Sequence, residues 1–201
     1  MTELRMVALD LSLAATGLAA THNHHGDAGL LARTVHTART AHGATDMDHA
    51  RVHAVLADLA AALKAMPHLV VIEWLPQFDG KGDASLRLSE LHGVIKHYLW
   101  TRKFPYVDVK PTYVQMWATG KGRASKTEVR AAVTAAYGHL VHVGSADEAD
   151  AVSLLTMGMA AYGQPLASTS SHQGRALGAV RWPDLVTEAG PVVPTVPGGA
   201  R

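Results

Sequence analysis

Residues 68–74 read His-Leu-Val-Val-Ile-Glu-Trp, an apolar run that ends in a carboxylate and a tryptophan. A continuous run of this kind is typical of a central strand covered on both faces. Before it, apolar residues recur at helical spacing over 46–66, and Pro67 ends that pattern. After it, a polar loop leads to a second helical pattern over 84–102. The centre of the chain is therefore expected to be a strand between two helices.

Further strands and helices are expected on both sides of this unit. Three short strands precede it, over residues 4–11, 16–22 and 29–37. Their close spacing is typical of an antiparallel meander. A strand over 104–110 and a short helix over 111–118 follow the unit. The last two helices begin at the capping-box motifs SKTE (from Ser125) and SADE (from Ser145), and extend to about residues 137 and 162.

This order of elements predicts an α/β domain over residues 1–163. Its core would be a mixed five-stranded sheet, with three antiparallel strands followed by two parallel ones, flanked by helices on both faces. Residues 164–201 form a C-terminal extension with five proline and five glycine residues. We expect it to be partly disordered, above all over 190–201. The exception is an apolar group that is expected to dock on the domain: Trp182, Leu185 and Val186.

The composition excludes several classes of protein. The chain has no cysteine, which excludes a disulfide framework and zinc–thiolate sites and fits a reducing compartment. No apolar run reaches the roughly 18 residues that span a bilayer, and no signal peptide is visible, so we expect a cytoplasmic protein without membrane association. The net charge is only +1, but residues 81–130 hold ten Lys and Arg against four Asp and Glu. Such a basic middle is suited to a polyanion.

Four carboxylates form the candidate site. Asp10 and Glu73 stand at the ends of apolar strands, where a charge is costly unless something offsets it. Asp147 and Asp150 begin the last helix and, at a spacing of three residues, share one of its faces. Glu148 between them is assigned to the capping box with Ser145.

The expected fold brings these acids together. The face that carries Asp147 and Asp150 continues as an apolar stripe through Leu154, Met157 and Ala161, so the two acids are expected to point inward over the sheet. All four carboxylates would then meet at one end of the sheet. Converging carboxylates of this kind indicate a divalent cation and a phosphate substrate.

Several stretches resemble the RuvC family of Holliday-junction resolvases, within the ribonuclease H-like superfamily. They are ALDLSLAATGLA (8–19), VVIEW (70–74), ASLRLSELHGVIKHYL (84–99), VDVKPTYVQMWATGKGRASKTEVRAAV (107–133) and ADEADAVSLL (146–155). Where the family has Gly-Ile-Asp-Pro-Gly, this chain has Ala-Leu-Asp-Leu-Ser, and the loop after Glu73 also differs. The acids are kept, so the departures affect the expected sequence preference rather than metal binding.

The resemblance implies a Mg²⁺-dependent endonuclease that resolves four-way DNA junctions by paired symmetric nicks, as a homodimer to which helix 84–102 contributes. Two Mg²⁺ ions about 4 Å apart would activate water and stabilise the leaving oxygen, and Mn²⁺ would substitute. We expect Asp10 to bridge the ions and Glu73 and Asp150 to complete the two sites. Asp147 would be the remaining ligand or would orient water. Lys126 matches the family's DNA-contacting lysine, which supports catalysis.

Other residues are candidates for binding DNA. Lys121 and Arg123 would contact the phosphate backbone beside Lys126. Weaker candidates of the same kind are Lys110, Lys81 and Arg87. Phe78 could stack on an unpaired base, whereas ordinary packing is the favoured interpretation of Trp74.

Alternative functions remain open at this point. The fold could serve a nuclease that acts on flaps or RNA–DNA hybrids, or a non-catalytic protein that binds branched DNA. A nucleotide cofactor is not expected, because GKGRASKT has Ser125 where a phosphate-binding loop requires glycine. Metal binding by His22 and His24 is likewise not expected, because histidines two apart at a strand end usually face solvent.

Overall fold

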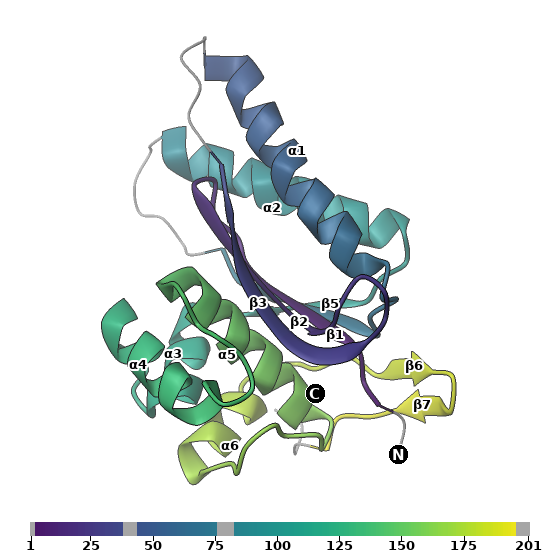
Figure 1. Cartoon of the computed structure of the whole chain (residues 1–201), viewed down its shortest axis with the longest axis vertical. Coiled ribbons are helices and arrows are strands. Elements are labelled where there is room, and N and C mark those ends of the chain that lie inside the picture. Colours follow the sequence, from purple (N-terminus) through teal and green to yellow (C-terminus); the bar gives the residue numbers. More distant parts are fainter. Residues whose placement is uncertain (1–2, 38–43, 76–82, 196–201) are drawn as a thin grey trace.

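The computed structural model describes residues 3–37, 44–75 and 83–195. Its centre is a five-stranded mixed sheet in the order β3-β2-β1-β4-β5 (Figure 1). The strands are β1 (Met6–Asp10), β2 (Ala15–His22), β3 (Ala28–His36), β4 (Leu69–Glu73) and β5 (Tyr106–Val109). The first three are antiparallel, and β4 and β5 run parallel to β1. The predicted fold class is confirmed.

Helices cover both faces of the sheet. Two of them, α1 (Ala44–Leu63) and α2 (Asp83–Thr101), pack on one face, and four lie on the other (Figure 1). Those four are α3 (Pro111–Thr119), α4 (Lys126–Tyr137), α5 (Ala146–Ala161) and α6 (Ser171–Gly178). None of the described helices is both long enough and apolar enough to span a bilayer.

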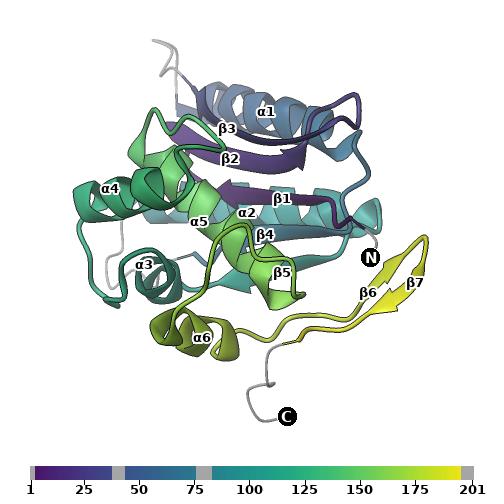
Figure 2. The same ribbon diagram turned by 60° about the horizontal axis from the view of Figure 1, so that its bottom comes forward.

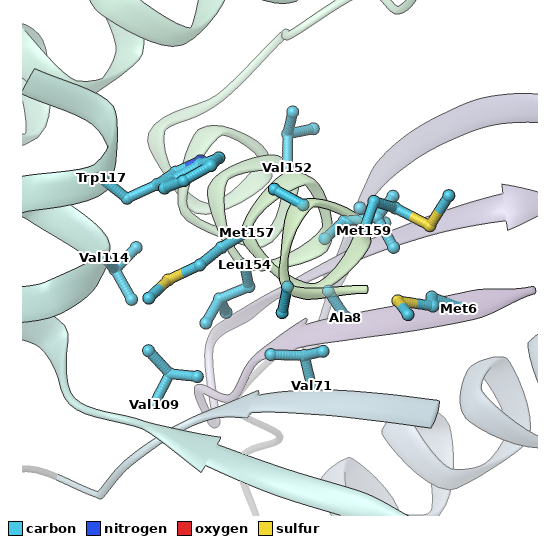
Figure 3. Packing of buried hydrophobic residues seen from close by; sticks show 14 of the residues in the cluster. Met6, Ala8, Val71, Val109, Val114, Trp117, Val152, Leu154, Met157 and Met159 are labelled. Carbon is cyan, nitrogen blue, oxygen red and sulfur yellow. The ribbon is translucent and has the colours of Figure 1, made fainter. Parts of the chain in front are cut away.

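The helix α5 lies across the middle of the sheet and is buried on all sides. Figure 3 shows Leu154 and Met157 between Val71 and Val109 of the sheet and Trp117 of α3. Every residue of α5 from Ala151 onward is buried, including two hydroxyl side chains. The predicted stripe of Leu154, Met157 and Ala161 is buried as expected, and the rest of the helix from Ala151 is buried as well, because α3 and α4 also pack against α5.

The C-terminal extension is more ordered over its described part than its composition predicts. After α6, the short strands β6 (Leu185–Thr187) and β7 (Gly190–Val192) pair as an antiparallel hairpin at the opposite end of the sheet from α4 (Figure 2). The strand β7 lies inside the stretch 190–201 that was expected to be disordered, which corrects that expectation for its first residues. Residues 196–201 lie outside the described residues.

The docking predicted for the apolar group is only partly correct. Trp182 and Leu185 are buried in the same core as α5, and the Trp182 indole N–H donates to the Leu177 carbonyl oxygen. Val186, by contrast, is 81% exposed. The difference follows from strand alternation, because successive side chains of β6 point to opposite faces. The division of the chain at residue 163 stays a prediction.

Candidate active site

Asp10 and Glu73 end two adjacent parallel strands on the same face of the sheet. Leu9 pairs with Ile72, so the next residues along both strands are also neighbours. Met6 and Ala8 of β1, and Leu69 and Val71 of β4, face α5. By strand alternation Asp10 and Glu73 face it too. Both acids lie at the same end of the sheet, the end at which the order of elements placed them.

The two strand acids lie within hydrogen-bond distance of each other. Their side chains hydrogen-bond to each other, which requires one carboxyl group to be protonated. Burial raises the pKa of Glu73 far above its ordinary value, and the charge of Asp10 raises it further. Burial also raises the pKa of Asp10, although the hydrogen bond from Glu73 and the charge of Lys126 oppose this. Burial and mutual repulsion therefore make it costly for both carboxyl groups to be ionised at once.

The acids of α5 reach the strand pair through a close backbone contact. Gly17 of β2 pairs directly with Asp10, and the backbone of Asp147 lies against Gly17. One turn further along the helix, Asp150 is largely buried. Burial and then the charge of Asp10 raise the pKa of Asp150 to about 7. The sequence analysis missed Gly17, although a glycine inside an otherwise apolar strand often marks a close backbone approach.

Lys126 supplies positive charge to this cluster. It is the first residue of α4, after a complete capping box between Ser125 and Glu128, as predicted. Its Nζ lies 3.0 Å from Oδ1 of Asp147. Partial burial lowers the pKa of Lys126, but its hydrogen bond to Asp147 and the nearby acids outweigh that effect and raise it. The helix α4 and the first turn of α5 lie at the end of the sheet where β1 and β4 finish (Figure 2).

Glu148 has a different role from the predicted one. The Ser145 half of the second capping box is present, since Ser145 Oγ accepts from the Glu148 backbone N–H at 3.0 Å. The Glu148 carboxylate, however, accepts from the Gly144 N–H (2.6 Å) and from the Thr34 hydroxyl of β3 (3.0 Å). Glu148 therefore ties the start of α5 to the sheet and stays outside the acid cluster.

The donor set suits a hard divalent cation, because it consists of carboxylate oxygens in a partly buried place with one neighbouring ammonium group. No group of three or more His, Asp or Glu side chains in the described ranges is already placed to hold a metal ion. The carboxyl groups are instead engaged with other partners, Asp10 with Glu73 and Asp147 with Lys126. Ionisation of both strand acids and release of Lys126 would make these oxygens available as ligands.

The other predicted DNA-binding residues differ in their surroundings. Lys121 and Arg123 are exposed in the loop before α4, and the Lys121 ammonium lies 2.9 Å from the Glu128 carboxylate. Lys110 is exposed and follows β5 at the same end of the sheet. Arg87 lies on α2, on the opposite face of the sheet from the acids. Lys81 and Phe78 lie outside the described residues.

Trp74 is not packed as expected. Its side chain is 44% exposed, directly after Glu73. The Lys96 ammonium lies 5.6 Å from the centroid of the Trp74 ring and 2.8 Å from the Asp108 carboxylate. The sequence analysis missed this group, since Lys96 and Asp108 come from α2 and β5 and no local pattern connects them. Trp74 is therefore an accessible aromatic surface that follows Glu73 and contacts α2, on the opposite side of the sheet from the acids.

The chain resembles proteins of known sequence and structure. No family model matches the sequence. Over 110 residues it is 31% identical to the crossover junction endodeoxyribonuclease RuvC of Gloeobacter violaceus. This match covers 54% of the chain and 62% of the relative, so it spans less than two thirds of the relative's length.

Two solved structures of Thermus thermophilus RuvC share the fold. The structure of RuvC in complex with a Holliday junction substrate has a TM-score of 0.55 and 20% identity, and the match covers 76% of this chain and 90% of that one. For the other RuvC structure the TM-score is again 0.55 at 20% identity, with 80% and 98% covered. The chain is thus similar in sequence to one RuvC over about half of its own length, and it shares its fold with another.

Proposed function

We propose that the protein is a Mg²⁺-dependent, structure-selective endonuclease that resolves four-way DNA junctions by paired nicks. The observation that carries the proposal is the meeting of Asp10, Glu73, Asp147 and Asp150 at one end of the sheet, with Lys126 beside them. Buried carboxylates that raise one another's pKa are costly for a fold and fit a site that binds cations. The resemblance to junction resolvases narrows this chemistry to branched DNA.

The acids would hold two Mg²⁺ ions, with Asp10 between them, Glu73 and Asp150 on either side, and Asp147 as a further ligand or a group that orients water. Such ions, when bound, activate a water molecule and stabilise the leaving oxygen in phosphodiester hydrolysis. Mn²⁺ would substitute, because it accepts the same oxygen ligands. Glu73 would lose its proton on binding, since a metal ligand must be deprotonated.

Lys126 would act on the substrate. Its ammonium group would leave Asp147 for the scissile phosphate and offset the negative charge that develops there. Lys121, Arg123 and Lys110 would contact neighbouring phosphates and so fix the position of the DNA. Lys81 and Arg87 are further candidates for phosphate contacts, and Phe78 for stacking on an unpaired base.

Two symmetric nicks require two active sites, so the proposal includes a homodimer. The surface that supports it is the exposed face of α2. Leu86 and Trp100 on this face are 72% and 69% exposed, and a side chain at Gly93 would meet no atom within 4 Å. These three residues recur at intervals of seven, which keeps them on one face of a helix. A second copy of the chain would cover this α2 surface.

The test compares substrates under matched conditions. Labelled four-way, flap, RNA–DNA hybrid and linear substrates are incubated with Mg²⁺ or EDTA, with wild type, Asp10→Asn and the control Asp27→Asn. Asp27 lies in the β2–β3 turn, away from the acids. We expect paired nicks on the four-way junction that EDTA and Asp10→Asn abolish and Asp27→Asn preserves. Cleavage of flaps or hybrids instead would favour a different nuclease, and binding without cleavage would favour a non-catalytic protein.

The cytoplasmic location and the absence of a nucleotide cofactor stay predictions.

A further inference from the structure

Four residues form one row across the sheet beneath the first turn of α5. Asp10 lies beside Glu73 on one side and pairs with Gly17 on the other, and Gly17 pairs with Thr34 on β3. In this row β1 and β4 carry the acids Asp10 and Glu73, and β2 and β3 carry Gly17 and Thr34. We name Gly17 and Thr34 the α5 seat, because both contact the start of that helix.

At Gly17 the helix backbone touches the sheet directly. A Cβ atom added at this position would lie 2.0 Å from the carbonyl oxygen of Asp147, 2.6 Å from its carbonyl carbon and 3.3 Å from the Ala151 Cβ. Non-bonded carbon atoms pack roughly 3.5–4.0 Å apart. Because the nearest neighbours are backbone atoms, no side-chain rotation can relieve the overlap. Any side chain at position 17 would push the first turn of α5 away from β2.

At Thr34 a side chain holds the same turn in place. The Thr34 Oγ1 lies 2.7 Å from Ser145 Oγ and donates to the Glu148 carboxylate at 3.0 Å. Ser145 is the N-cap of α5, and its Oγ accepts from the Glu148 backbone N–H. The seat therefore combines contact at Gly17 with hydrogen bonds at Thr34, and both fix the height of one helical turn above the sheet.

We propose that the α5 seat is a positioning device for divalent cations. It sets the separation between the helix acids Asp147 and Asp150 and the strand acids Asp10 and Glu73, and hence the affinity for the ion they share. This inference rests on the proposed function, because it takes the four acids as the cation site. It assigns a role to Gly17 and Thr34, neither of which offers a ligand to the ion.

The chain provides a matched control for each seat residue on α5 itself. Gly158, near the other end of α5, also packs tightly, but an added Cβ would meet side chains, Val71 Cγ2 at 2.9 Å and Met6 Sδ at 3.1 Å. Thr156 Oγ1 accepts from the Trp117 indole N–H at 2.9 Å, remote from the acids. Gly158→Ala and Thr156→Val should therefore destabilise the fold without moving Asp147 or Asp150.

The experiment measures Mn²⁺ binding by calorimetry or electron paramagnetic resonance, without DNA. We expect Gly17→Ala and Thr34→Val to weaken Mn²⁺ binding by about 10- to 100-fold, the usual effect of losing a group that orients a metal ligand. Gly158→Ala and Thr156→Val should bind Mn²⁺ like the wild type, even where their melting temperatures fall as far. Circular dichroism identifies the variants that fold.

Two outcomes would overturn the inference. One is wild-type Mn²⁺ affinity in folded Gly17→Ala or Thr34→Val, and Thr34→Val decides alone if Gly17→Ala does not fold. The other is an equal loss of affinity in the α5 controls, which would reduce the effect to general destabilisation. Failure of the proposed function has a different signature, because the wild type itself would then bind no Mn²⁺ or leave junctions uncut.

Discussion

The ammonium group of Lys126 lies 3.0 Å from Oδ1 of Asp147, so the acid cluster carries a cation of its own. The charge of Lys126 lowers the pKa of Asp10, Glu73 and Asp150, in opposition to their burial. The charge of Lys126 thus offsets part of the negative charge of the acids, as a bound cation would. Its side chain is still mostly exposed, which leaves the ammonium accessible to a phosphate group.

Replacing Lys126 tests this double role. We expect Lys126→Ala to lower the single-turnover rate of junction nicking by roughly 100- to 1000-fold, the usual effect of removing one group that stabilises transition-state charge. Lys126→Arg should retain part of the rate, because it keeps the charge. The rate is measured at saturating DNA, so that weaker binding does not contribute. Lys64→Ala, an exposed lysine at the end of α1, is the control. A Lys126→Ala rate within threefold of wild type would contradict the assignment.

The metal-free protein should lose stability as the pH rises from 4 to 8. The pKa of Asp150 is about 7 in the folded protein, against an ordinary value of 3.8. A carboxyl group with a raised pKa favours the folded state while it is protonated, and that contribution disappears as the pH passes the folded pKa. At about 1.4 kcal/mol per pKa unit, Asp150 alone would lower the free energy of unfolding by up to about 4 kcal/mol. Melting curves in EDTA measure the trend, and Asp150→Asn should flatten it.

Mg²⁺ should restore at pH 8 the folding stability that the protein loses as the pH rises. A ligand that binds only the folded state at 100 times its dissociation constant adds about 2.7 kcal/mol to the free energy of unfolding. The melting temperature of the wild type should therefore rise with Mg²⁺ or Mn²⁺. Asp10→Asn should show little of this rise, and Asp27→Asn should keep it. A wild-type melting temperature that does not respond to either ion would count against the site.

Lys121 and Arg123, in the loop before α4, should differ in their effect on DNA binding. Each phosphate contact contributes about −0.9 to the slope of log affinity against log salt. Arg123→Ala should therefore reduce this slope by about one. Lys121→Ala should reduce it less, because the Lys121 ammonium must first leave Glu128, 2.9 Å away. Fluorescence anisotropy with labelled junctions between 50 and 200 mM salt, in the Asp10→Asn background, measures both slopes. A larger effect of Lys121 would contradict the comparison.

The sequence predicted the features that depend on local periodicity. The ends of the strands that carry Asp10 and Glu73 follow from their apolar runs, and the start of α4 follows from the Ser125–Glu128 capping box. The sheet, with its three antiparallel and two parallel strands, follows from the order and spacing of the elements. Each of these features depends on residues that are close together in the chain, so it can be predicted from the sequence alone.

Most of what the sequence did not predict depends on contacts between distant segments. The close approach of Gly17 to Asp147 joins residues far apart in the chain. The burial of α5 beyond the predicted stripe of Leu154, Met157 and Ala161 depends on the packing of α3 and α4 against its other side. The contact of Trp74 with Lys96 of α2 also joins distant segments. The strand β7 pairs with the nearby β6, and it was missed because its proline and glycine content favours disorder.

The exposed face of α2 should decide the oligomeric state. Trp100 is stacked on His97, with ring centroids 6.1 Å apart, and both lie on the α2 surface with Leu86 and Gly93. A charge at the centre of an apolar interface is left unpaired and desolvated, so Trp100→Glu should convert a dimer into monomers. Light scattering after size exclusion measures the mass. Val186→Glu places the same charge on the β6–β7 hairpin and should leave the dimer intact. The monomeric variant should also lose the pairing of its nicks, while a dimeric Trp100→Glu would place the interface elsewhere.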